Sequence, residues 1–350
     1  MKRNTITLIA LLLISGAMDA HDFAVTQNHQ NIYFSIIDED AKTAVVTYSG
    51  SIGNYQPSAC AGELEIPSKV RYRDVVYTIV GIGPKAFSGA DKLTGVILPE
   101  TIEKIGDFAF EGCTSLKKIV FPSNPVEFGQ GTFFKCDKIQ EVSLGNNWPE
   151  VNLQLFRWSD SLRSITIPAK VEKIKDMKRL KCLQEMNVDS SNTRFTSIAG
   201  ILYNKNAEIL YGCPRAYDKS VEVPEGTKRI YQGAFIDCKN IETVDLPESL
   251  HAMSFREFSR MKGIKAIIFR KQTPFLNAKG SDEQFYFLLQ VANPEIKVVV
   301  PKKGMKEYQK VLAKQTGEYY EMEDVKPYFV DENFILKANN ITSLEKFIKQ

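Results

Sequence analysis

The amino-acid sequence predicts a solenoid in which short parallel strands stack along one face. The first observation is a recurring phrase of an apolar residue, any residue, a second apolar residue and proline, as in Val96–Pro99 and Ile119–Pro122. The second is its period, because the two prolines lie 23 residues apart and the same interval leads to Gly145 and then to Pro168. Self-similarity at a fixed period of this length is typical of a stacked repeat protein.

The residues around each phrase fit the frame of a leucine-rich repeat. Leu116–Asn124 and Ile139–Asn147 both follow the pattern L-x-x-L-x-L-x-x-N, and repeats of this class have periods of about 20–29 residues. A single unit cannot bury its apolar face, so the stability of such a fold comes from stacking. We therefore expect a leucine-rich-repeat solenoid of period 23, with short parallel β-strands on one face and irregular or helical-turn return arms.

The period is broken at three places. Residues 152–156 replace the usual return-arm residues of the fourth unit, and the sixth unit is two residues short, so that its phrase ends at Asp189. The next proline, Pro224, then follows after 35 residues, which predicts an insertion at 190–220. The later phrases end at Pro247, Arg270 and Pro301.

The ends of the chain predict export and two caps. Residues 1–17, or alternatively 1–20, have a basic start, an apolar run and small residues, which is the pattern of a secretory signal peptide. Residues 22–60 suggest an N-terminal β cap built on a hairpin, residues 61–301 form the solenoid, and residues 302–350 suggest a C-terminal cap with helices at Lys302–Lys314 and Ser343–Ile348.

The predicted location is the periplasm, the cell surface or the medium. No cysteine follows the apolar run to accept a lipid anchor, and no other stretch approaches about 18 consecutive apolar residues, so no transmembrane segment is expected in the mature chain. The formal charge is +3, which gives no reason to expect nucleic-acid binding, since that requires concentrated basic patches.

The residues that could carry chemistry favour a structural role. Cys113, Cys136 and Cys238 each lie nine residues before the end of a phrase, at a position that also accepts alanine, serine and methionine, and therefore predict small buried side chains. The spacing leaves open a disulfide between Cys113 and Cys136. The sequence has only three histidines and no CxxC pair, so we expect no metal site, no cofactor and no enzyme.

The surface best placed to bind a partner is the outward row of the strands. Residues between the two apolar members of each phrase point away from the core. The row consists of Ile97, Val120, Ser143, Thr166, Asn187, Glu222, Asp245, Ile268 and Val299. Its apolar ends and its polar, acidic middle suit a protein partner, but an exposed ladder retained only for β propensity is an equally good interpretation.

A second pattern precedes each strand and carries a family resemblance. Ile105-Gly106 is followed by Ala109-Phe110, by Gly112-Cys113 and by the strand ending at Pro122, and Gly233–Cys238 repeats part of it. These residues resemble the repeat of the BspA-like leucine-rich-repeat proteins, common among exported proteins of Bacteroidetes. The resemblance implies an adhesin-like module that binds a protein of the host or of the bacterial surface.

An alternative function is glycan binding in support of carbohydrate uptake. Trp148, Phe156 and Trp158 form the only dense aromatic cluster, and aromatic platforms suit sugar rings. The same three residues could instead pack the core of the aberrant fourth unit.

Overall fold

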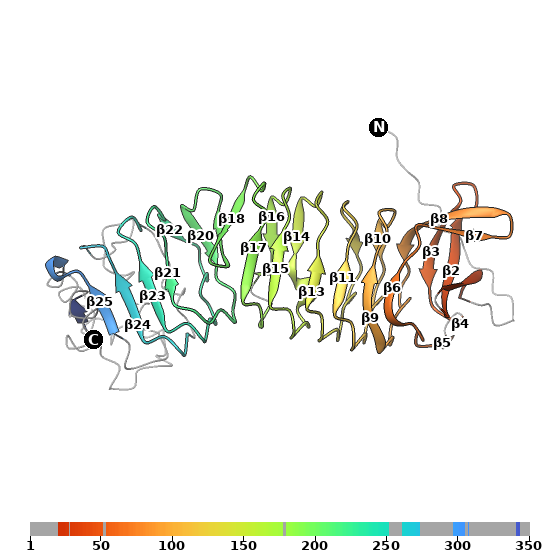
Figure 1. The fold of residues 1–350 in the computed structure, drawn as a ribbon, viewed down its shortest axis with the longest axis horizontal. Helices are drawn as coiled ribbons and strands as arrows, with labels where there is room; N and C mark the ends of the chain where they lie inside the picture. Colours follow the sequence, from red (N-terminus) through yellow and green to blue (C-terminus); the bar gives the residue numbers. More distant parts are fainter. Residues whose placement is uncertain are drawn as a thin grey trace, which may run out of the picture.

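The protein is an elongated stack of short strands that lie across its long axis (Figure 1). The computed structural model describes residues 20–27, 29–51, 54–177, 180–251, 261–273, 297–304, 307 and 341–343. The expected signal peptide and most of the expected C-terminal cap, including nearly all of the predicted helix over residues 302–314, lie outside these residues. Within them the fold is a β-solenoid.

The predicted strands form a parallel ladder, here called the front ladder. Its first sheet has the order β13-β11-β9-β6, its second pairs β15 with β17, and its third has the order β21-β23-β24-β25-β26. The strands are β6 (Ala61–Glu65), β9 (Lys92–Ile97), β11 (Lys118–Val120), β13 (Glu141–Ser143), β15 (Ser164–Ile167), β17 (Glu185–Val188), β21 (Val221–Glu222), β23 (Thr243–Leu246), β24 (Ala266–Phe269), β25 (Lys297–Val300) and β26 (Ile341–Ser343).

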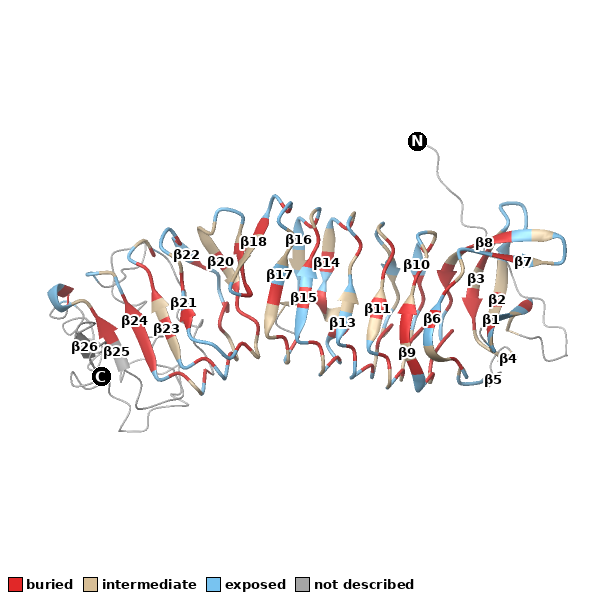
Figure 2. Ribbon diagram, in the orientation of Figure 1, coloured by how far each residue is buried: buried red, intermediate tan, exposed pale blue. Residues whose placement is uncertain are grey.

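The register of the front ladder confirms the period. Ile119 pairs with Val96 on one side and Val142 on the other, each 23 residues away. Ile165 pairs instead with Met186. This interval is two residues shorter than the period, in agreement with the two-residue deletion predicted for the sixth unit. Inward side chains such as Ile119 are buried and alternate with more exposed neighbours along most of these strands, whereas β24 is buried throughout (Figure 2).

The return arms differ from the expectation, because most contain a short strand rather than only irregular turns. These strands form a second parallel ladder, here called the back ladder. Its members are β8 (Val75–Ile82), β10 (Lys104–Ile105), β12 (Glu127–Phe128), β14 (Glu150–Asn152), β16 (Lys173–Lys175), β20 (Ile209–Gly212) and β22 (Arg229–Ile230). Helical structure is sparse among the described residues, the clearest case being the 3-10 turn η1 (Leu153–Phe156).

The N-terminal strands extend the back ladder. β1 (Phe23–Gln27) and β2 (Gln30–Asp38) pair antiparallel, β2 pairs antiparallel with β3 (Thr43–Thr47), and β3 runs parallel to β8, which also pairs with β7 (Lys69–Tyr72). A small hairpin joins β4 (Gly50–Ser51) to β5 (Asn54–Tyr55). The Gln30 side chain exchanges two hydrogen bonds with the backbone of Ala61 and so occupies part of the free edge of β6.

The core between the two ladders holds a column of stacked phenylalanines. Phe87, Phe110, Phe133 and Phe156 follow one another at 23-residue intervals, with ring centroids 5.2, 5.4 and 5.8 Å apart. Phe156 therefore continues the column although its unit lacks the surrounding signature. Phe108, by contrast, has a left-handed backbone (φ 55°) and is only half-buried.

One position of the back ladder, here called the glycine slot, changes character along the chain. It holds Gly83, Gly106 and Gly129 in the first turns and Asn152, Lys175, Tyr211 and Tyr231 in the later ones. A Cβ atom on Gly106 would lie 2.6 Å from the backbone nitrogen of Pro84, and one on Gly129 would lie 2.5 Å from that of Asp107. The regular turns thus have no room for a side chain there.

The insertion forms an antiparallel meander that divides the core. β18 (Phe195–Ile198) pairs with β19 (Ile201–Asn204), and β19 pairs with β20. Leu202 packs into the apolar cluster on the N-terminal side, whereas its neighbours Ile201 and Tyr203 pack into a separate cluster on the C-terminal side. β19 is therefore a wall between two cores.

A buried asparagine anchors the insertion. The Asn192 amide donates to the carbonyls of Pro168 (2.8 Å) and Val171 (3.0 Å), and its oxygen accepts the backbone amides of Arg194 and Phe195 (both 2.8 Å). Since Asn192 is fully buried, these four bonds fix the path of the chain into β18.

The described C-terminal residues add one unexpected strand. β26 pairs in parallel with β25 and includes Ser343, where we expected a helix to begin. Lys302–Gly304 forms a 3-10 turn rather than the start of an α-helix.

Candidate functional site

The front ladder brings the predicted outward residues together in three groups. Ile97, Val120 and Ser143 lie side by side, and Thr166 lies beside Asn187. The third group is Glu222, Asp245, Ile268 and Val299. The meander of the insertion separates the second group from the third.

Exposure along this row differs from the expectation at its C-terminal end. Ser143, Thr166, Asn187 and Glu222 are exposed, and Ile97, Val120 and Asp245 are half-buried. Ile268 is only 6% exposed and Val299 is fully buried, so these two do not belong to the accessible surface.

One residue of the row was not predicted. Glu65 of β6 pairs with Ile97 and is exposed. The accessible surface, here called the front row, therefore runs from Glu65 to Asp245.

The acidic part of the front row is partly balanced by an arginine. Arg270 occupies the position that is proline in most other units, and its guanidinium donates to both oxygens of Asp245 (2.9 and 2.8 Å) and to Glu222 (2.8 Å). Hydrogen bonding to Asp245 raises the pKa of Arg270, so this cation is permanent. One positive charge therefore offsets one of the two negative charges at this end.

The opposite end of the face is also charge-balanced. Lys118 reaches across the neighbouring turn to Glu63, with 3.9 Å between the charged atoms. The residue between them is Gly95, whose missing side chain leaves the space that the Glu63 side chain fills. Between the two charged ends, Ser143, Thr166 and Asn187 present hydroxyl and amide groups without charge.

The proposed aromatic patch is not a common surface. Trp148 and Phe156 are buried (3% and 1% exposed), and the Trp148 indole nitrogen donates to the carbonyl of Asn124 (2.8 Å). Trp158 is 42% exposed and packs edge-on against Phe134. The interpretation that these aromatic residues pack the core of the fourth unit therefore holds for two of the three, Trp148 and Phe156.

The cysteines are free thiols, and five of the six are buried. Cys113 and Cys136 each donate to a phenylalanine carbonyl of the preceding turn, at 3.2 and 3.0 Å. The neighbouring Cys136 thiol and burial together raise the pKa of Cys113, and burial raises that of Cys213. Cys113, Cys136 and Cys238 fill core positions, as their spacing predicts.

The described residues contain no group of three histidine, cysteine or acidic side chains that could hold a metal ion. Nor does the described part of the chain contain a helix both long and apolar enough to span a bilayer.

Comparison with known proteins identifies the repeat. Six copies of the BspA type leucine rich repeat region match residues 77–200 and 206–279, which together make up more than half of the chain. No curated protein sequence matches.

Solved structures of leucine-rich-repeat proteins are also similar. One is from Bacteroides ovatus (22% identity, 81% of each chain, TM-score 0.45), and another is the pneumococcal vaccine antigen PcpA (16% identity, 83% of this chain and 96% of that chain, TM-score 0.43). A third is a leucine rich cell surface protein from Faecalibacterium prausnitzii (19% identity, 80% and 89%, TM-score 0.38). On the extent of the repeat match, the chain belongs to the BspA-type leucine-rich-repeat family.

Proposed function

We propose that this protein is an exported, non-enzymatic binding module that engages a protein partner through the front row. Membership of a repeat family supports an interaction role, because stacked repeats present long continuous surfaces. The observation that carries the proposal is the uncharged centre of the front row, where Ser143, Thr166 and Asn187 project from consecutive turns onto an open face.

The spacing of the face indicates how a partner would bind. Paired strands of a sheet lie about 4.8 Å apart, so Thr166 and Asn187 offer a hydroxyl and an amide group at that interval. Ser143 continues the row from the preceding sheet. Half-buried Ile97 and Val120 continue the row with apolar contacts. A protein segment lying across the turns would meet hydrogen-bonding groups at the centre and apolar side chains beside them.

The charged ends would contribute to specificity more than to affinity. Glu63 pairs with Lys118 and Asp245 pairs with Arg270, so these charges are already matched within the protein. An exposed pair such as Glu63 with Lys118 contributes about 0–1 kcal/mol. A strongly charged partner would therefore gain little from this face, and a partner with a neutral contact surface suits it best.

Affinity capture tests the proposal. The mature protein is immobilised and exposed to extracellular-matrix proteins and to cell-surface extract, and the captured partner is identified. The triple variant Val120→Ala, Thr166→Ala, Glu222→Ala should weaken its capture at least about tenfold. The control is Lys104→Ala, Glu127→Ala, an exposed ion pair of the back ladder. Unchanged capture by the triple variant would exclude the front row.

A further inference from the structure

The back ladder is interrupted at the insertion, and a cleft lies at the interruption. β14 and β16 form a two-stranded sheet, and the next back strands belong to the four-stranded sheet β18-β19-β20-β22. The cavity between them has a volume of about 800 Å³ and is lined by Ile174, Arg194, Asn204, Tyr211 and Tyr231, among others. Small-molecule sites usually measure about 300–1,000 Å³.

We propose that this cleft binds a short neutral oligosaccharide. The proposal concerns a different surface from the front row and does not depend on a protein partner there.

Two tyrosines form one wall of the cleft. Tyr211 and Tyr231 pair across adjacent turns with ring centroids 5.8 Å apart, and Phe195 supports Tyr211 at 5.7 Å. Tyr231 is 51% exposed, one of four large apolar side chains in the described residues with more than a third of their surface in water. A half-exposed pair of phenol rings offers apolar faces to the C–H groups of a pyranose and hydroxyl groups at the rim.

The fold does not require the second of these tyrosines. Both occupy the glycine slot, which in the first regular turns excludes every side chain and from Asn152 onward holds one. Tyr211 packs against the first core, whereas Tyr231 is 51% exposed. Packing therefore does not account for the Tyr231 ring, which favours a role in binding.

The opposite wall offers hydrogen-bond acceptors of the backbone. In earlier turns the carbonyl of Glu103 accepts the amide of Glu127 (2.9 Å), and that of Ile105 accepts the amide of Gly129 (2.8 Å). The equivalent carbonyls belong to Glu172 and Ile174, and both residues line the cleft. No described strand continues the ladder beyond β16 to use them. Sugar hydroxyls are suitable donors for such carbonyls.

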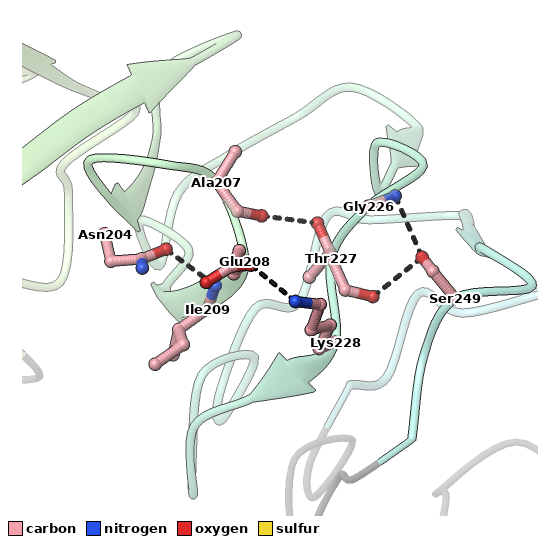
Figure 3. A network of polar contacts seen from close by, with 8 residues as sticks. All are labelled: Asn204, Ala207, Glu208, Ile209, Gly226, Thr227, Lys228 and Ser249. Atoms are coloured by element: carbon pink, nitrogen blue, oxygen red, sulfur yellow. Dashed lines mark hydrogen bonds and ion pairs between the residues drawn. The ribbon is translucent and has the colours of Figure 1, made fainter.

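A fixed amide group completes the site. The Asn204 side-chain oxygen accepts the backbone amide of Ile209 (2.7 Å), which leaves its NH₂ group as a donor. The adjoining turn is held by Thr227, whose hydroxyl donates to the carbonyl of Ala207 (2.9 Å), and by the ion pair of Lys228 with Glu208 (Figure 3). Ser249 of the following turn bonds Thr227 in the same network. This wall is therefore preorganised.

The charges around the cleft nearly cancel, which favours a neutral ligand. Two acidic side chains, Glu172 and Asp176, face three basic ones, Lys173, Arg194 and Lys205. Lys173 pairs with Glu150 (3.3 Å), and the Lys205 ammonium donates to the carbonyl of Ser190 (3.0 Å). An acidic or basic ligand would gain little from this set, whereas neutral hydroxyl groups can use every member of it.

Affinity electrophoresis tests the proposal. The purified mature protein is run through gels containing one polysaccharide each: β-glucan, α-glucan, mannan, xylan, galactan or the acidic polygalacturonan. We expect at least one neutral polysaccharide to retard the protein. Tyr231→Ala should weaken that association about threefold to tenfold, and Tyr211→Ala with Tyr231→Ala should abolish it.

Two controls make the result decisive. Trp158→Ala removes an exposed aromatic side chain outside the cleft and should leave the retardation unchanged. The triple variant of the front row should also be retarded normally. If the double tyrosine variant loses its native circular dichroism spectrum, Tyr231→Ala alone decides, because Tyr231 is exposed.

Three outcomes would overturn the proposal. These are no retardation by any neutral polysaccharide, retardation that survives Tyr231→Ala unchanged, and retardation by polygalacturonan alone. Selection of peptides from a displayed library that compete for the tyrosines, without polysaccharide binding, would assign the cleft to a protein segment instead.

Discussion

The regular turns from β6 to β13 and the interrupted turns from β17 to β22 use the same repeat in different ways. In the regular turns both ladders are continuous, the phenylalanines stack and the glycine slot admits no side chain. In the interrupted turns both ladders break, the core divides at β19, and tyrosines fill the glycine slot. Regular stacking therefore gives a continuous core, whereas the interruption leaves a cleft.

The largest effect is expected where the regular core is densest. Phe110→Ala should lower the free energy of unfolding by about 3–5 kcal/mol, because Phe110 stacks on Phe87 and Phe133 and leaves a closed cavity. Phe195→Ala should cost less, since Phe195 borders the cleft and water can fill the space. Urea unfolding monitored by circular dichroism measures both. Equal losses would contradict the contrast between the two regions.

The next effect concerns the anchor of the insertion. Asn192→Ala should cost about 3 kcal/mol, since each buried group left without a partner costs about 1–3 kcal/mol. Asn147→Ala is the matched control, because its hydrogen bonds to Asn124 and Lys170 are exposed, and it should change stability by less than about 0.5 kcal/mol. Both are measured by urea unfolding, and a loss at Asn192 no larger than the control would show that the meander does not depend on this residue.

The glycine slot gives a direct comparison at one structural position. Gly106→Ala should destabilise the protein by about 1–3 kcal/mol, because the new Cβ would approach the backbone of Pro84. Tyr231→Ala places alanine at the equivalent position of the interrupted region and should change stability by less than about 0.5 kcal/mol. Thermal unfolding of the two variants tests this difference. Similar losses of stability would contradict the claim that the slot has room for a side chain only in the later turns.

The smallest effect is a pH dependence shared by both cores. Cys113 lies in the first core and Cys213 in the second, and the folded state raises the pKa of each. The contribution of each thiol to the free energy of unfolding is fully present below the unfolded-state pKa of about 8.5. Above that pKa the contribution falls by about 1 kcal/mol per pH unit. Cys113→Ala and Cys213→Ala should each reduce this fall between pH 8 and 10, as measured by urea unfolding. An unchanged slope would mean that the thiol is accessible to water.

The periodic part of the fold was predictable because one phrase determines both the strand and its register. The front ladder, its inward residues and the buried cysteines such as Cys113 follow from the 23-residue spacing. The back ladder was missed because strands of two residues, such as Lys104–Ile105, show no alternation of their own. Periodicity alone carries no signal for them.

The candidate sites were less predictable because they depend on contacts between distant units. The position of Ile268 in the phrase predicted an exposed side chain, but its burial depends on tertiary packing. Arg270 pairs with Glu222, 48 residues away, and nothing in the sequence links them. Tyr211 and Tyr231 could have been noticed only by aligning Ile230-Tyr231 with Ile105-Gly106, which shows a tyrosine at a position that is glycine in the first turns.

Hydrogen exchange tests the central claim, the division of the molecule at β19, most directly. Leu202→Ala and Tyr203→Ala change neighbouring residues whose side chains enter different cores. We predict that Leu202→Ala speeds amide exchange mainly in β15 and β17, and that Tyr203→Ala speeds it mainly in β21 and β23, as measured by mass spectrometry of peptides from each region. Equal acceleration on both sides by either variant would contradict the division and show a single cooperative core.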